Sequence, residues 1–158
     1  MTSEAFARQI VDMMQVLYRV CYVQLPQAAD REDAVQECLR KAWEKRSKLR
    51  EDKYLQTWLI RILINECHTI QRKRKRITLV ETLPVDTRKF PSEDVRLREA
   101  LLVLEESLRM PILLHYIEGY RIDEVAQMLK LPQGTIKTRM VRGRKQLKQI
   151  LLEEVFEG

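Results

Sequence analysis

One stretch of the chain, EGYRIDEVAQMLKLPQGTIKTRMVRGRKQL at 118–147, constrains the fold most, because it has the pattern of a helix, a tight turn and a second helix. The first part carries apolar residues at helical spacing: Ile122, Val125, Ala126 and Leu129. Pro132 cannot continue that helix, and Gly134 adds a permissive backbone position. The second part repeats an apolar seam every three or four residues: Ile136, Met140, Gly143, Leu147 and Ile150.

The second of these helices is basic on the side that its seam leaves free. Between 134 and 148 it has no acid and six basic residues: Lys137, Arg139, Arg142, Arg144, Lys145 and Lys148. Such a face carries donors for phosphates and for base edges in the major groove. A basic face alone would also fit a solvated helix. The acid-rich first helix, the Pro-Gly turn and the acid-free second helix together favour a DNA-reading helix-turn-helix.

Composition sets the class of protein. The chain has 158 residues, 45% hydrophobic and 33% charged, which is enough for one medium domain or two small ones with apolar cores. Only 4 glycines and few alternating β-branched runs indicate an all-α fold. The net charge of +6 favours a polyanionic partner without saying which one.

Several classes of site are disfavoured by the residues present. Cys21, Cys38 and Cys67 are widely spaced and form no CxxC pair, so small buried side chains are the better interpretation. We expect no metal and no cofactor. No secretion signal or membrane-spanning run is evident, so we expect a cytoplasmic protein. A nucleic-acid enzyme such as a nuclease stays open only through Glu66 and His68, which make a poor metal site.

The first half predicts three amphipathic helices, at about 4–24, from about 30 onward, and from about 54 to 76. A polar loop, 46–53, separates the second and third. In the first helix the expected core positions are Phe6, Ile10, Met13, Met14, Leu17, Val20 and Cys21. In the second they are Ala34, Val35, Cys38, Leu39, Ala42 and Trp43, and in the third Leu55, Leu59, Ile62, Leu63 and Ile70.

The third helix also carries a second basic footprint. Arg61, Asn65, His68 and Arg72 share one face, and the helix ends in an unbroken cationic run at 72–76. That run could be a simple helix C-terminal cap. Two separate basic stretches nevertheless fit a long polyanion better than a small ligand.

Residues 77–93 lose the helical period and contain Pro84 and Pro91, so we interpret them as a linker. A second helical unit follows from about Ser92. It continues with a helix at 108–117, which has Pro111 in its first turn and is packed by Ile112, Leu113, Tyr116 and Ile117. The predicted organisation is two small helical domains, 1–76 and 93–158, joined by a linker at 77–92, the second domain being of the helix-turn-helix type.

Both halves resemble one family. DREDAVQECLRKAW at 30–43, TWLIRILINECHTIQRKRKR at 57–76 and the stretch 118–147 resemble, in that order, three conserved parts of bacterial RNA polymerase sigma factors. The likeness is to the extracytoplasmic-function (ECF) group of the sigma-70 family and covers nearly the whole chain. It implies a transcription initiation factor without enzymatic activity, which binds core polymerase and reads a −35 duplex and a melted −10 strand.

The resemblance also implies roles for individual residues. For binding the β′ clamp helices of core RNA polymerase it implies Asp33, Gln36, Glu37 and Arg40. For the −10 strand it implies the 46–53 loop with Lys48, and Trp58, Arg61, Asn65, His68, Arg72 and Arg74. For the −35 duplex it implies Arg121, Lys137, Thr138, Arg139, Val141, Arg142 and Lys145. The polymerase β flap, promoter DNA and an anti-sigma factor are the implied partners, with no membrane insertion and a monomer when free.

This chain departs from the family pattern at four positions. Thr69 stands where an acid is usual, and Lys130 where a glycine commonly ends the first reader helix. Arg121 replaces a Ser or Thr N-cap, which would free it for a phosphate, and Gly143 replaces an alanine at a cost of about 1 kcal/mol in helix propensity. The competing interpretation is a dimeric helix-turn-helix regulator that acts without being a polymerase subunit, although no heptad seam supports a dimer.

Overall fold

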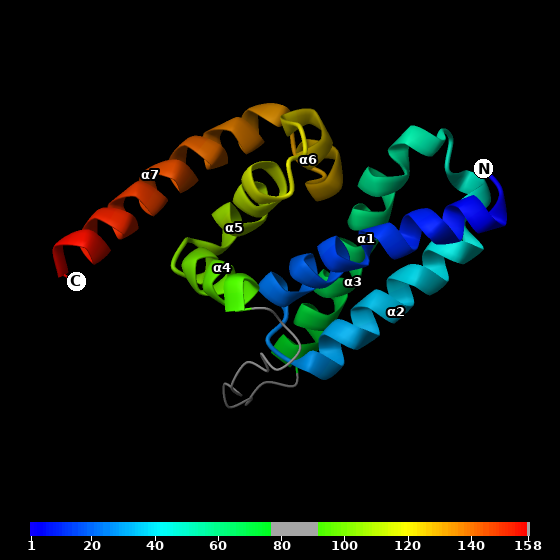
Figure 1. The fold of residues 1–158 in the computed structure, drawn as a ribbon, viewed down its shortest axis with the longest axis horizontal. Coiled ribbons are helices and arrows are strands. Elements are labelled where there is room, and N and C mark those ends of the chain that lie inside the picture. The colour runs from blue at the N-terminus through cyan, green and yellow to red at the C-terminus, as the bar shows by residue number, and fades with distance from the viewer. Residues whose placement is uncertain (77–91, 158) are drawn as a thin grey trace. The chain divides into compact units, whose positions relative to one another are not determined.

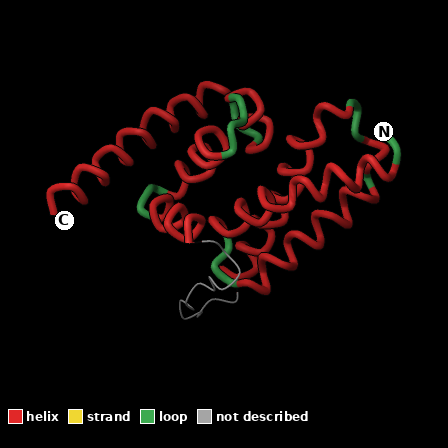
Figure 2. The backbone as a smooth tube through the Cα atoms, in the orientation of Figure 1, coloured by secondary structure: helices red, strands yellow, loops and turns green. Residues whose placement is uncertain are grey.

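The computed structural model describes residues 1–76 and 92–157, so the predicted linker lies almost entirely outside the described residues. Over that range every regular element is a helix, as Figure 2 shows, and the all-α prediction is confirmed. The chain divides into two compact units, 1–89 and 90–158. Within the described ranges, no helix combines the length and the apolar character needed to cross a membrane.

Unit 1 is built from three helices, α1 (Ser3–Gln24), α2 (Ala28–Glu44) and α3 (Leu55–Arg76), each of which packs on the other two (Figure 1). Two short 3₁₀ turns, η1 (Arg46–Lys48) and η2 (Asp52–Tyr54), lie in the connection from α2 to α3. The most deeply buried side chains come from all three helices: Leu17, Val20, Cys21, Ala34, Cys38, Ala42, Leu59, Ile60, Leu63 and Cys67. The core therefore lies on the common axis of the three helices.

The predicted core of unit 1 is mostly right, but it is too narrow on α3 and includes one exposed residue. Ile60 and Ile64 are buried, whereas Ile62 and Ile70, predicted as core, are only half-buried. The face of α3 that packs on α1 and α2 is therefore wider than the single predicted stripe. Three core predictions outside α3 are also only half-buried: Ile10, Met14 and Leu39. Trp43, also predicted to face inward, is 45% exposed at the end of α2.

Polar side chains fix how the helices of unit 1 join. The buried Arg31 of α2 donates hydrogen bonds from Nη1 to the carbonyl oxygens of Leu25 (3.0 Å) and Pro26 (2.9 Å), which lie just past the end of α1. Asp30, in the first turn of α2, accepts two hydrogen bonds from Arg74 near the end of α3 (2.9 and 2.8 Å). Lys41 forms an ion pair with Glu66 across α2 and α3. Each of these contacts gives a partner to a buried or nearly buried charge, and burying that charge without a partner would destabilise the fold.

Unit 2 contains α4 (Ser92–Leu102), α5 (Glu106–Ile112), the π-turn η3 (Leu113–Ile117), α6 (Ile122–Leu129) and α7 (Gln133–Glu157). The long helix α7 packs on both α5 and α6 (Figure 1). Its buried positions Ile136, Met140 and Gly143 belong to the predicted seam, while Leu147 and Ile150 are half-buried.

The helix that was predicted at 108–117 has different bounds in the structure. The helix begins earlier, at Glu106, so Pro111 lies inside it rather than in its first turn. Proline has no N–H and its ring crowds the preceding turn. A π-turn follows, in which the Glu118 N–H donates to the Leu113 carbonyl at 3.0 Å. The wider turn rotates Tyr116 and Ile117 away from the core, and they are 45% and 46% exposed, so their predicted burial is wrong.

Gly143 is the point of closest approach between α7 and α5. A Cβ built on Gly143 would lie 2.7 Å from Cδ1 and 2.8 Å from Cγ1 of the buried Ile112. These distances are well inside van der Waals contact. The glycine therefore loses helix propensity but allows the two helices to pack closely.

We predict that Gly143→Ala lowers the unfolding free energy of the full chain by about 1 kcal/mol, because overpacking costs more than the gain in helix propensity. Urea denaturation followed by circular dichroism measures the change. Gly134→Ala is the matched control on the same helix: no atom lies within 4 Å of the added Cβ, and the substitution should stabilise by up to about 1 kcal/mol. Equal stabilisation by both substitutions would contradict the steric argument.

Candidate nucleic-acid and polymerase interfaces

The helix-turn-helix of unit 2 is closed by a single left-handed residue. Lys130, directly after α6, has φ 56° and ψ 46°, the conformation that glycine usually supplies at this position. The Leu131 N–H donates to the Ala126 carbonyl at 3.0 Å, and α7 begins at Gln133. A lysine is strained there by roughly 1–2 kcal/mol, so packing of α6 on α7 must hold the turn.

Arg121, at the start of α6, is engaged with acids rather than extended freely. Its backbone N–H donates to Oε1 of Glu124 at 3.0 Å, so the Glu124 carboxylate caps the start of the helix. Its guanidinium donates to both carboxylate oxygens of Asp123, at 3.1 and 3.3 Å. That hydrogen bond is the main cause that lowers the pKa of Asp123. Contact of Arg121 with a phosphate therefore requires an exchange of partners.

Apart from Arg121, which precedes α6, the residues expected at the −35 element lie together on α7. Lys137, Thr138, Val141, Arg142 and Lys145 are exposed at spacings that place them on one helix face, and Arg139 is half-buried beside it. Arg142 reaches the turn before α5, where its Nη2 lies 2.9 Å from Oε2 of Glu105. Apart from this ion pair, the face is basic and exposed to solvent, and it occupies one side of α7.

The residues expected at the −10 element occupy the outer face of α3. Arg61, Asn65, His68 and Arg72 are exposed, and Trp58 is half-buried at the start of the helix. Thr69, the departure from the family pattern, supports this face: its hydroxyl donates to the Asn65 carbonyl at 3.0 Å and accepts from Nη2 of Arg72 at 3.2 Å. Lys48 is exposed in η1, within the predicted loop.

Arg74 differs from the other residues in this set. Both of its hydrogen bonds to Asp30 are short and well formed, and they raise the pKa of the guanidinium further. The Asp30 side chain is only 11% exposed, so loss of Arg74 would leave a nearly buried carboxylate unpaired. The main role of the Arg74 side chain is thus structural: it joins α3 to α2 through Asp30.

The residues expected to bind polymerase form the polar face of α2. Asp33, Gln36 and Arg40 are exposed and Glu37 is half-buried. Arg40 donates to both carboxylate oxygens of Glu37 and to Glu44 (2.6 Å), and the hydrogen bond from Arg40 lowers the pKa of Glu37. A polar groove of about 450 Å³ joins this face to the end of α3, with Thr69, Lys73 and Arg74 opposite Asp33, Gln36 and Glu37.

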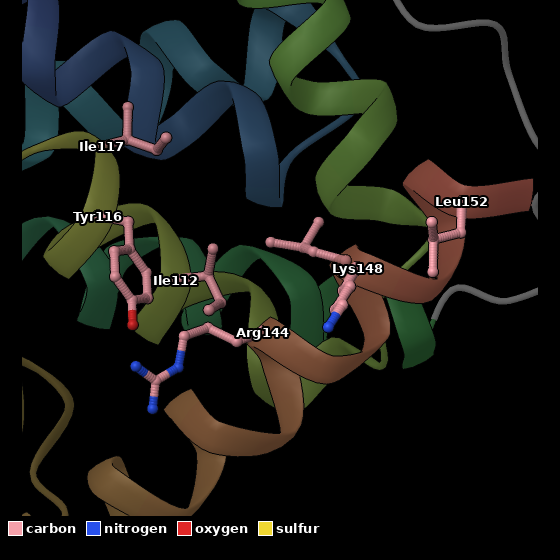
Figure 3. Close-up of a pocket in the computed structure, with 7 residues that line it drawn as sticks. Ile112, Tyr116, Ile117, Arg144, Lys148 and Leu152 are labelled. Carbon is pink, nitrogen blue, oxygen red and sulfur yellow. The ribbon is translucent and has the colours of Figure 1, made fainter. Parts of the chain in front are cut away.

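Unit 2 also has an apolar groove that the sequence did not reveal. The groove measures about 460 Å³ and runs between η3 and the second half of α7 (Figure 3). Its lining consists of Ile112, Tyr116, Ile117, Leu147 and Leu152, with Arg144 and Lys148 along one side. The guanidinium of Arg144 lies 6.0 Å from the centre of the Tyr116 ring. The spacing of Tyr116 and Ile117 in the sequence predicted that both would be buried. They are exposed because the π-turn rotates them away from the core.

The chemistry of a nuclease is not supported by the groups near the basic faces. Glu66 is 8% exposed and paired with Lys41, while His68 is exposed on another side of α3. Among the described residues no cluster of His, Cys, Asp or Glu could hold a metal ion. The three cysteines are buried, and burial raises the pKa of Cys38 to about 12, which is the behaviour of unreactive core thiols.

Comparison with known families matches both units. The sequence model for Sigma-70 region 2 matches residues 10–77, and that for Sigma-70, region 4 matches residues 94–147. Among curated proteins, the ECF RNA polymerase sigma factor SigW of Bacillus subtilis is 29% identical, over 94% of this chain and 90% of its own length. The sigma factor SigV of the same organism is 27% identical over 92% and 90%. These matches do not favour the dimeric regulator.

Solved structures agree. The sigma factor RpoE of Bartonella quintana, crystallised with the anti-sigma factor NepR, superposes with a TM-score of 0.80 at 27% identity, covering 94% of this chain and 97% of its own. CnrH, solved with the cytosolic domain of CnrY, shares the fold with a TM-score of 0.73 at 24% identity, covering 95% and 89%. With regions 2 and 4 present in order, the chain belongs to the extracytoplasmic-function group of the sigma-70 family of RNA polymerase sigma factors.

Proposed function

We propose that this sigma factor binds core RNA polymerase through unit 1 and reads its promoters at two elements. The −35 element is read as duplex by α7, and the −10 element as an opened strand by the 46–53 connection and α3. The observation that carries the proposal is the pair of exposed basic helix faces on two separately folded units, each in the region that matches the family. Residues 1–76 and 93–158 are the two functional domains, with a linker at 77–92.

The same proposal assigns the remaining surfaces. The polar face of α2 binds the β′ clamp helices. The apolar groove of unit 2 receives the β flap of polymerase, since an exposed apolar groove is a common docking site for a partner segment. An anti-sigma factor holds the protein inactive, by analogy with relatives crystallised in that form. The protein acts in the cytoplasm as a monomer, catalyses no reaction, and binds promoters less tightly as salt concentration rises.

Run-off transcription tests the proposal as a whole. Core polymerase is mixed with the protein on genomic fragments that include the DNA upstream of its own gene. We expect discrete transcripts that require the added protein. Binding of the protein to DNA without any transcript would instead support the dimeric regulator.

We predict that Arg139→Ala lowers transcription from −35-dependent promoters by about tenfold or more, because one base-edge contact is worth about 1–3 kcal/mol. Binding to core polymerase, measured by fluorescence anisotropy, should not change. Arg139→Lys keeps the charge but not the bidentate geometry and should recover little specificity. Loss of core binding in Arg139→Ala would contradict the assigned role.

We predict that Glu37→Ala has the opposite effect: core affinity falls by about tenfold, while binding of unit 2 to −35 duplex is unchanged. Glu44→Ala is the matched control, because Glu44 is the second carboxylate that pairs with Arg40 and lies outside the predicted polymerase set. Equal losses in the two variants would mean that only the orientation of Arg40 matters.

We predict that Ile117→Glu weakens binding to the isolated β flap domain by about tenfold, since it places a charge on the apolar floor of the groove. The matched control is Val103→Glu, which adds the same charge at a 61% exposed apolar residue of unit 2 that does not line the groove. Isothermal titration gives both affinities. If Val103→Glu weakens binding as much, the effect is one of net charge and the groove is not the binding site.

A further inference from the structure

Trp43 is an aromatic residue at the edge of the core of unit 1, and it is only partly buried. The residue is 45% exposed, although its position in α2 predicts an inward orientation. Phe6 of α1 holds the ring from the core side, with ring centroids 6.0 Å apart and planes tilted by 57°. The indole is therefore fixed in place while much of its surface remains accessible.

Arg46, in η1, stacks on this indole. Its guanidinium carbon lies 3.7 Å from the centre of the Trp43 ring, and its Nη1 donates to the Trp43 carbonyl oxygen at 2.7 Å. The backbone around it is also held, since the N–H groups of Lys48 and Leu49 donate to the carbonyls of Lys45 (2.8 Å) and Arg46 (3.3 Å). An exposed arginine is thus held in one orientation by a ring, a carbonyl and a 3₁₀ turn.

The acids that flank this arginine in the sequence have partners elsewhere. Glu44 pairs with Arg40, Glu51 with Lys53, and Asp52 with the N-terminal amino group. At the far end of the connection, Lys53 also lies over an exposed ring, that of Tyr54, at 5.1 Å. Lys53, however, is a point charge already bonded to Glu51, whereas Arg46 presents a flat, charged plane.

We propose that Arg46 is a stacking platform for one unpaired base of the opened promoter strand, and that Trp43 is the residue that positions it. A guanidinium plane has two faces: one covers the indole, and the other is available to a base. Unpaired bases stack on aromatic rings and on arginine planes, and the positive charge also attracts the strand. Pre-orientation by Trp43 lowers the entropy cost of forming that stack. This inference rests on the proposed function and adds a residue to its −10 site.

The alternative is that Arg46 only caps α2, because the Trp43 carbonyl lies in the last turn of that helix. A helix cap requires a positively charged hydrogen-bond donor, but it does not require the planar guanidinium group of an arginine. Arg46→Lys separates the two roles, since lysine keeps the charge and can still donate to the carbonyl, but it cannot stack.

The test uses holoenzyme on a promoter found by run-off transcription. 2-Aminopurine replaces single bases of the non-template strand across the −10 region, and its fluorescence reports stacking in the open complex. With the wild-type protein we expect one quenched position within the opened strand. Arg46→Ala and Arg46→Lys should both restore fluorescence at that position and shorten the open-complex lifetime by about tenfold, the range expected for one stacked base.

Lys45→Ala is the matched control, because it removes a neighbouring exposed cation and should leave the quenched position as in the wild type. Thermal unfolding and core affinity of the Arg46 variants establish that they fold. If Arg46→Lys behaves as wild type, or if no position changes in either variant, the stacking role is overturned. If the wild type yields no transcript, the proposed function itself falls, which the same assay shows before any variant is compared.

Discussion

The burial of one wide apolar face of α3 is the constraint on which the architecture of unit 1 depends. Because Leu59, Ile60, Leu63 and Cys67 are all inaccessible to solvent, α3 must lie against α1 and α2 at the same time. That leaves one outward face, and it is the face on which Arg61, Asn65, His68 and Arg72 lie. The polar residues of α2 are turned outward for the same reason. Packing therefore decides which charges can meet a partner.

Many of the exposed cations already hold an acid of the same unit. Arg40, Arg121 and Arg142 each do so at exposed positions, where an ion pair is worth only about 0–1 kcal/mol. Exchanging such an acid for a phosphate or a polymerase group costs little, and the pair keeps the side chain oriented until then. Arg74 is different, because its acid, Asp30, is nearly buried. Exchange there would be expensive, which separates structural cations from those available for binding.

The fold could be predicted from the sequence where a single apolar stripe at helical spacing covers the buried positions of a helix. The helix-turn-helix was found this way: α6 occupies Ile122–Leu129, and Ile136, Met140 and Gly143 of α7 are buried as expected. Helical spacing alone did not predict which residues are buried in α3 and at the π-turn. In α3 the buried face is wider than one stripe and also includes Ile60 and Ile64, and the π-turn after α5 moves Tyr116 and Ile117 outward. Of the candidate site, the exposed basic residues could be predicted, but the ion pairs Arg142–Glu105 and Arg74–Asp30 could not, because these two contacts join distant parts of the chain.

The two predictions of burial that failed most clearly concern the residues that now carry functional proposals. Trp43, Tyr116 and Ile117 are apolar residues at helical spacing, and burying any of them would be worth about 1.5–3 kcal/mol. All three are instead half-exposed, and a cation lies beside two of them: Arg46 at Trp43, and Arg144 at Tyr116. An exposed apolar surface with a cation beside it suits an anionic partner that also has apolar or aromatic surface, whether an unpaired base or a protein segment. Under the proposed function, the free protein gives up stability at these positions, and binding of such a partner offsets that loss.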